Sequence, residues 1–342
     1  MMHGNMQQPL AVRDSNMELL RITAMLLVLL VHADFKTLGF PSISDLQDAP
    51  FMTFSRIYIG AISSVCVNVF ILISGWYGIK LKVKSLAKII FQTWFFCILM
   101  YLCFGGGFSI GSILHECKDI LLLRQYWFVR AYILLMLMAP AMNALVDHAS
   151  KHDFKLLLIG WLIFQTLFSY IGNEIWYYDG YSPLPFFGLY LLARYMRLYY
   201  PHWTTLSRKW DISIFLFVSL LISIISIILL LLDWGGGRMY NYTSPLIIIT
   251  SAYLLLFFSK LNIKSTFINW IAISCFAAYL LHMNPYFMDK WYVGVIAGWW
   301  QTESGGLFLL YVTIYILALF AVSVLIDKVQ MGLFNFIYCR KR

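Results

Sequence analysis

Arg21 and His32 are separated by ten residues, nearly all of them apolar. Eleven helical steps of about 1.5 Å span about 16 Å and close nearly three turns, so both side chains fall on almost the same helix face. A guanidinium can bind anionic groups, and an imidazole can exchange a proton near neutral pH. Taken alone, Arg21 is typical of a cation anchored at a membrane interface, and His32 of a hydrogen-bonded histidine near the headgroups. Their shared face favours a joint role.

The chain that must position these residues carries too little charge for a soluble protein. Of its 342 residues, 61% are hydrophobic and 12% are charged, and the mean hydropathy is +0.76. Soluble domains have about 25% charged residues, and several apolar runs here approach the roughly 20 residues that cross a bilayer. We therefore predict an all-α, multi-pass membrane protein. The net charge of +9 is explained by cations flanking the spans, so we expect membrane lipids and no nucleic acid as partners.

The apolar runs define ten candidate transmembrane helices. They cover about 17–35, 57–79, 86–104, 127–146, 155–172, 184–200, 212–232, 245–259, 268–287 and 305–326. The second contains the run SGWYG, and we expect a glycine break there to face protein or a cavity, because lipid-exposed irregular backbone is not tolerated.

Lysine and arginine residues are distributed unevenly between the two sides of these spans. With the N-terminus inside, 18 of the 25 fall on inner segments and 7 on outer ones. This bias fits the positive-inside rule with both termini cytoplasmic. We expect a single membrane domain over residues 1–342, with a short cytoplasmic tail at 1–16 and no attached soluble domain. A cleaved signal peptide is the alternative for the first span, because small residues in VHA precede Asp34.

Further polar residues lie close to the predicted membrane boundaries. Lys84 and Lys88 are four residues apart and share a helix face, which suits phosphate binding, although ordinary positive-inside charge explains each one equally well. His282 and Asn284 lie at the outer end of the ninth span, where a histidine at a helix end is the competing explanation. The six cysteines show no CxxC spacing and no HExxH motif occurs, so we expect no metal site.

Several sequence blocks, taken in order, resemble the acyltransferase-3 family of bacterial membrane O-acyltransferases. The family signature, an arginine followed by ten residues and a histidine, is matched by Arg21 and His32 in RDSNMELLRITAMLLVLLVHADF. The segment NVFILISGWYGIKL is similar to the family's FFxxSGFxxxx block and matches it at Phe70, Ser74 and Gly75. Further blocks are KSLAKIIFQTWFF, YWFVRAYILLMLMAPAMNAL and AAYLLHMNPYF.

The resemblance implies transfer of an acyl group, commonly acetyl, from cytoplasmic acyl-CoA to a hydroxyl of a surface glycan or its lipid-linked precursor. It also implies residence in the bacterial inner membrane, with acetyl-CoA as the acyl donor. Two sequence blocks depart from the family's habits. Lys84 and Lys88 stand where arginines are common, and YWFVRAYI keeps Trp127 but lacks the acidic pair of a WSLxVEEQ-like run. An acidic role in that block therefore does not transfer to this chain.

Within this framework, Arg21 lies near the entrance of the donor and His32 acts as general base for the sugar hydroxyl, or as an acylated nucleophile. Ser74 and Gly75 are interpreted as a break that lets helices or substrate approach, because no GxSxG elbow is present. Asp34 is a weak candidate to orient His32, since residues two apart on a helix do not face each other. The competing function is a glycan or lipid transporter whose path is lined by the same ionisable residues.

Overall fold

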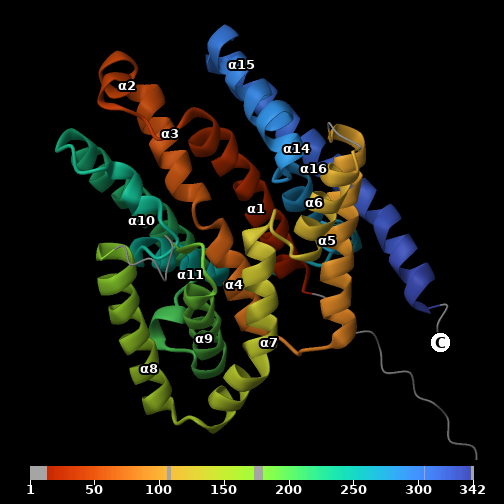
Figure 1. The fold of residues 1–342 in the computed structure, drawn as a ribbon. Helices are drawn as coiled ribbons and strands as arrows, with labels where there is room; N and C mark the ends of the chain where they lie inside the picture. Colours follow the sequence, from red (N-terminus) through yellow and green to blue (C-terminus); the bar gives the residue numbers. More distant parts are fainter. Residues whose placement is uncertain (1–13, 106–108, 173–179, 304, 340–342) are drawn as a thin grey trace, which may run out of the picture.

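The structure is a computed structural model that describes residues 14–105, 109–172, 180–303 and 305–339. Within these ranges the chain is almost entirely helical and contains no β-strand, which confirms the predicted all-α fold. Helices α1, α4 and α11 lie in the middle of the bundle, between α8 and α10 on one side and α5 and α16 on the other (Figure 1). Arg13, one of the cations counted on the inner side, lies outside the described residues. So do Glu174 and Asp179, two acidic residues of a predicted outer loop that are possible partners of His32 by sequence.

The helices follow one another along the chain with short connections. They are α1 (Ser15–Val31), η1 (His32–Lys36), α2 (Ile43–Asp48), α3 (Pro50–Ser63), α4 (Cys66–Tyr77), α5 (Val83–Phe104), α6 (Ile110–Leu121), α7 (Trp127–His148), α8 (Lys151–Phe164), η2 (Gln165–Ile171), α9 (Pro183–Tyr199), η4 (His202–Thr204), α10 (Arg208–Leu231), η5 (Gly236–Tyr240), α11 (Pro245–Ser259), α12 (Thr266–Ala272), α13 (Phe276–His282), α14 (Pro285–Phe287), η6 (Met288–Val293), α15 (Gly294–Thr302) and α16 (Gly305–Cys339).

Most of the predicted spans are long, apolar helices. In the described part of the chain, seven helices are long and apolar enough to cross a membrane, and the pair Thr266–His282 and Pro285–Thr302, bent by 65°, would make an eighth. The predicted spans 17–35 and 184–200 are also helical, but α1 and α9 have 17 residues each, close to the minimum of about 17 for a crossing. The chain is thus a multi-pass membrane protein, and the count of ten spans stays a prediction.

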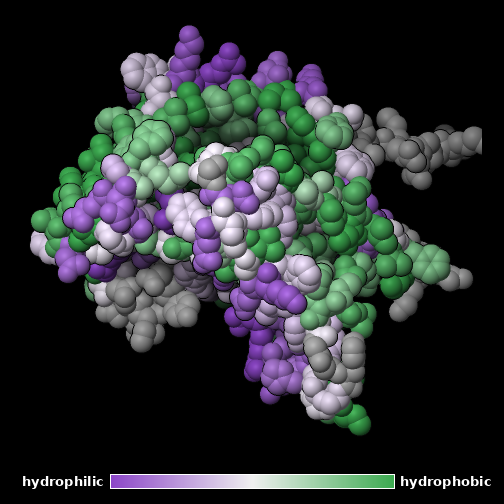
Figure 2. Space-filling view, turned by 90° about the horizontal axis from the view of Figure 1, so that it is seen from above, coloured by the Kyte–Doolittle hydropathy of each residue, from purple (hydrophilic) through white to green (hydrophobic). Residues whose placement is uncertain are grey.

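Large apolar side chains cover the outside of the bundle. Leu162 of α8, Phe217 of α10 and Leu325 of α16 are all exposed. Seen from above, hydrophobic residues form much of the periphery, whereas hydrophilic residues gather in patches over the middle and at projecting edges (Figure 2). Because a soluble protein rarely exposes large continuous apolar surfaces, this distribution fits a lipid-facing belt.

The prediction of a helix break at SGWYG is wrong. Helix α4 continues through Ser74 and Gly75 to Tyr77, and the second predicted span is interrupted instead at the turn between Ser63 and Cys66. A Cβ built on Gly75 would clash with the carbonyl oxygen of Tyr190 in α9. The glycine therefore permits close packing of two helices, and the chain leaves the helical path only at Gly78, where φ is +73°.

Helix α1 is fixed at both ends by long-range hydrogen bonds. Near its start, Asn16 Nδ2 donates to the carbonyl oxygen of Phe258 at 2.9 Å. Near its end, the Tyr292 hydroxyl donates to the carbonyl oxygen of Leu29 at 2.6 Å. The helix then continues into the π-helical turn η1 rather than ending. These contacts hold the segment that carries Arg21 and His32 against α11 and η6.

Candidate functional site

Arg21 and His32 line two different cavities on one side of α1. The His32 cavity has a volume of about 480 Å³, and the Arg21 cavity one of about 280 Å³. Residues from α4, α7 and α13 contribute to the walls of both. The two side chains therefore face the same neighbouring helices at different depths, as their spacing along the helix predicts.

The His32 ring is held by a second histidine. His282 Nδ1 lies 2.6 Å from the carbonyl oxygen of Ala278, which can only accept, so in a neutral His282 this nitrogen carries the proton. His282 Nε2 is then an acceptor, and it lies 2.9 Å from His32 Nδ1, which donates to it. His32 Nε2 is left with its lone pair as the nitrogen available to a ligand in the cavity.

His282 is placed behind His32 by the bend of the ninth predicted span. Helix α13 ends at His282, and the chain turns before α14 begins at Pro285. The His282 side chain is fully buried, whereas that of His32 is only partly buried and lines the cavity. The sequence singled out both histidines, and the structure brings them together across 250 positions of the chain.

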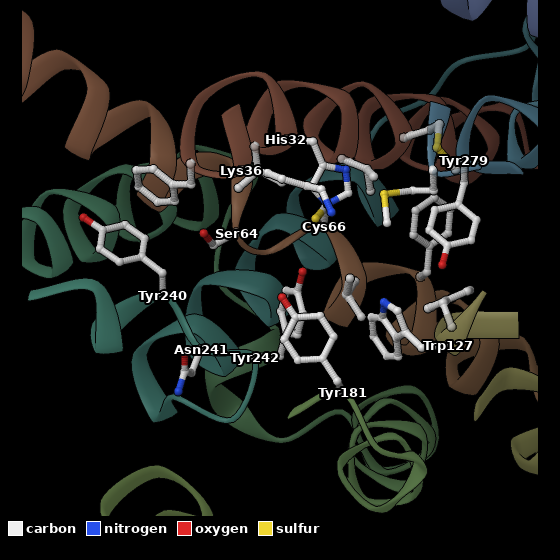
Figure 3. Close-up of a pocket in the computed structure, with 18 of the residues that line it drawn as sticks. His32, Lys36, Ser64, Cys66, Trp127, Tyr181, Tyr240, Asn241, Tyr242 and Tyr279 are labelled. Carbon is white, nitrogen blue, oxygen red and sulfur yellow. The ribbon is translucent and has the colours of Figure 1, made fainter. Parts of the chain in front are cut away.

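The π-helical turn η1 adds a cation to the same cavity. Lys36 is the last residue of this turn and lines the His32 cavity, as Figure 3 shows. No sequence motif marks Lys36 as a site residue, and it is one of the seven cations that the positive-inside count assigns to outer segments. Asp34, in the same turn, faces away and binds Arg56, with 2.7 Å between Oδ1 and Nε. The group that orients the His32 ring is therefore His282 and not Asp34.

Aromatic side chains form the wall opposite His32. Trp127, Tyr181 and Tyr242 lie together there (Figure 3), and the Trp127 and Tyr181 rings are 4.7 Å apart. Asn68 of α4 positions part of this wall by donating to the carbonyl oxygen of Tyr242 at 2.9 Å. Aromatic faces flanked by hydroxyl groups offer a sugar both apolar contact and hydrogen bonds. Trp127, a substrate-side candidate from the sequence, therefore lines the same cavity as His32.

The Arg21 cavity has a different character. Arg21 and Lys88 are the only Lys, Arg, Asp or Glu residues among the described residues that line it. Arg21 NH1 also binds Glu18 at 2.9 Å, and the Arg21 side chain keeps 33% of its surface exposed. Lys84 lies one helical turn before Lys88 on α5, is exposed, and is not part of the cavity wall.

Two other candidate residues, Ser74 and Asn284, make hydrogen bonds that mainly hold the helices together. Ser74 lines the Arg21 cavity, where its hydroxyl lies 3.1 Å from that of Tyr132 and also donates to a backbone carbonyl at 2.9 Å. Asn284 is fully buried and lines neither cavity. Its amide donates to Gln125 at 2.9 Å and to the Tyr126 hydroxyl at 3.0 Å, so it ties the bend after α13 to the start of α7.

A buried carboxylate behind the Arg21 cavity escaped the sequence analysis. Gln92, a cavity residue on α5, donates to Asp327 Oδ1 of α16 at 2.6 Å. Asp327 is completely buried within a membrane-spanning helix. Acidic residues inside apolar spans are uncommon, and that signal could have drawn attention to it. In the described part of the chain no group of three or more His, Cys, Asp or Glu side chains is arranged to bind a metal ion.

Comparison with known proteins shows the family of this chain. No curated protein and no solved structure shows significant similarity to the chain. A family model described as an acyltransferase domain matches residues 14–328, which include both cavities and every candidate residue named above. The match covers nearly the whole chain, and we conclude that this multi-pass membrane protein belongs to the acyltransferase-3 family and is an acyltransferase.

Proposed function

We propose that the protein transfers an acyl group, preferentially acetyl, from acyl-CoA in the Arg21 cavity to a hydroxyl of a surface polysaccharide, or of its lipid-linked precursor, in the His32 cavity. The observation that carries this proposal is the hydrogen-bonded pair of His32 and His282, which leaves His32 Nε2 unprotonated at the wall of an aromatic cavity. A neutral imidazole in that tautomer is a general base that is already oriented for its task.

In the proposed reaction, His32 Nε2 removes the proton of the acceptor hydroxyl while its oxygen attacks the thioester carbonyl. The new ester C–O bond forms as the C–S bond breaks. The proton then passes from His32 to the departing sulfur, which leaves as the free thiol of CoA. During the step the imidazolium is stabilised by its Nδ1–H hydrogen bond to His282 Nε2, while the proton of His282 stays on its own Nδ1 and is donated to the carbonyl oxygen of Ala278.

The charge of the Arg21 cavity supports its assignment to the donor. The nucleotide end of acyl-CoA carries phosphates, and Arg21 and Lys88 both bring a cationic side chain to the wall of this cavity, with Glu18 paired to Arg21. Arg21 can fork onto a phosphate, whereas Lys88 acts as a point charge. Because acyl-CoA is cytoplasmic, the proposed role requires the start of α1 to lie on the cytoplasmic side of the bacterial inner membrane. The positive-inside bias supports the same side for both termini.

The aromatic wall supports the His32 cavity as the acceptor site. Trp127, Tyr181 and Tyr242 offer flat apolar faces and hydroxyl groups to a sugar ring. In the proposed orientation, the His32 end of α1 faces the outside of the cell. A glycan would therefore enter this cavity from the outer side. Acyl-CoA, a glycan acceptor and the surrounding lipids are thus the proposed partners.

A transfer assay tests the proposal directly. Purified protein in detergent receives radiolabelled acetyl-CoA and the cell's own surface polysaccharide, first stripped of its esters with mild alkali. We expect label in the glycan and free CoA in equal amounts. Glycan or lipid movement across proteoliposomes without any dependence on acyl-CoA would instead identify a transporter. Label retained on the protein after quenching without acceptor would identify an acyl-histidine route in place of general-base catalysis.

A further inference from the structure

The two cavities meet at three phenylalanine side chains. Phe70, Phe128 and Phe276 are the residues that line both the His32 cavity and the Arg21 cavity in the described structure. The Phe128 ring lies between the other two, with ring-centre distances of 6.2 Å to Phe70 and 6.1 Å to Phe276. Each ring comes from a different helix, namely α4, α7 or α13.

The helices that carry these rings divide their side chains between the two cavities. On α4, Cys66 lines the His32 cavity and Ser74 the Arg21 cavity, with Phe70 midway between them. On α7, Trp127 belongs to the His32 cavity and Tyr132 to the Arg21 cavity. On both helices the phenylalanine therefore stands at the boundary, where one side chain faces both spaces.

The boundary lies closer to Arg21 than to His32. Met25, one turn after Arg21 on α1, already lines the His32 cavity. A donor bound through its phosphates near Arg21 must therefore pass the three rings before its thioester can approach His32, about 16 Å away along the helix. Phe70 and Phe276 are only partly buried, whereas Phe128 is buried.

We propose that Phe70, Phe128 and Phe276 form an aromatic constriction that admits the thioester arm of the donor, limits the size of the acyl group that can pass, and separates the two cavities when no donor is bound. This inference rests on the proposed function for its acyl-size role. Three apolar rings offer no hydrogen bonds to water, so a closed constriction keeps water away from the thioester and prevents an open aqueous path across the membrane. Trimming one ring widens the passage without removing a charged or polar group.

The acyl-size role is tested by competition between donors. Phe70→Ala and Phe276→Ala are each assayed with acetyl-CoA and hexanoyl-CoA, and Phe217→Ala on the lipid-facing side of α10 is the matched control. We expect the ratio of hexanoyl to acetyl transfer to rise about tenfold, the scale on which a pocket discriminates small changes in apolar size. Hydrolysis of acetyl-CoA without acceptor should rise as well. An unchanged ratio in both variants would overturn the size-limiting role.

The separation of the cavities is tested without any enzymatic activity. Cys66 lines the His32 cavity and Cys275 the Arg21 cavity, so each space is bordered by a native thiol. Both cysteines are otherwise buried, so a reagent reaches each thiol only through its own cavity. Sealed membrane vesicles are treated on one face with a small, charged, membrane-impermeant thiol reagent, and peptide mass spectrometry follows each cysteine. In the wild type we expect Cys66 to react from one face and Cys275 from the other.

In Phe70→Ala and Phe276→Ala, the same reagent should reach both thiols from either face. Phe128→Leu, which keeps much of the volume of a buried side chain, should give an intermediate result. If both thiols of the wild type react equally from one face, the rings do not separate the cavities and the proposal fails. If the labelling pattern is as expected but no acyl transfer occurs, the constriction stands and the proposed function fails.

Discussion

The two cavities are built by the same helices and yet offer opposite chemistry. The Arg21 cavity presents two cations and small polar groups, whereas the His32 cavity is walled by aromatic rings around an imidazole and one lysine. The difference shows how one short helix could serve the two proposed substrates, because ten residues of α1 separate a site suited to phosphates from a site suited to a hydroxyl. Each variant below changes a residue of one cavity or one that supports it, and the measurement shows whether the function of the other cavity is affected.

The largest expected effect is that of His32→Ala. Loss of a general base lowers the rate by about 10² to 10⁴, so kcat for acetyl transfer should fall on that scale while the affinity for acetyl-CoA is unchanged. Transfer is followed by label in the glycan, and donor affinity by calorimetry. His115→Ala, which alters an exposed histidine on α6, is the matched control. Full activity in a normally expressed His32→Ala protein would contradict the base assignment.

A smaller loss is expected for His282→Ala, because His282 positions the base without lining either cavity. A misplaced reacting group costs about 10²-fold in rate, so kcat should fall by about that factor while KM for both substrates changes little. His282→Gln can still accept the proton of His32 Nδ1 and should restore part of the rate. If kcat falls as far in His282→Gln as in His282→Ala, the hydrogen bond from His32 Nδ1 is not the source of the effect.

Changes in the Arg21 cavity should act on the donor instead. A hydrogen bond to a charged group contributes about 1.5–3 kcal/mol, so Arg21→Gln should raise KM for acetyl-CoA by at least about tenfold, with a smaller change in kcat. Lys88→Gln should behave in the same way with a weaker effect, since a lysine contacts phosphate through a point charge. Arg130→Ala, at an exposed arginine of α7, is the control. An Arg21→Gln enzyme with unchanged donor affinity would remove Arg21 from the donor site.

Lys36→Gln should give the smallest effect, and only on the acceptor. Its side chain is exposed at the edge of the His32 cavity, where a charge contact contributes about 0.2–1 kcal/mol. We expect KM for an acidic polysaccharide to rise a few-fold, KM for a neutral one to stay constant, and donor affinity to be unaffected. A change in donor affinity would show that Lys36 reaches the Arg21 cavity.

The sequence was a good guide to α1 because helical periodicity acts over short distances. The spacing of Arg21 and His32 predicts a shared helix face, and the two cavities lie on one side of that helix. Of the two lysines predicted to bind phosphate, Lys88 lines the Arg21 cavity and Lys84 does not, and their phosphate-binding role stays a prediction. Apolar runs also predicted where the helices lie, although helix ends and breaks depend on local turn geometry, and the break between α3 and α4 falls at Ser64 and Val65 rather than at SGWYG.

Contacts between distant parts of the chain were beyond the reach of the sequence. The hydrogen bond between His32 and His282 depends on how the bent segment after α13 packs against α1. Gly75 resembled a break because its role, close contact with Tyr190 of α9, is visible only once the two helices are packed. The phenylalanine constriction has no local signature, since Phe70, Phe128 and Phe276 are ordinary members of apolar helices until their rings meet.

The most direct test of the two-cavity account is the structure of the His32→Ala protein, determined by cryo-electron microscopy with acetyl-CoA. The account predicts density for the donor phosphates beside Arg21 and Lys88, with the arm passing Phe70, Phe128 and Phe276 and the acetyl group beside the space left by the His32 ring. Donor density confined to one cavity, or phosphates bound in the aromatic cavity instead, would contradict it.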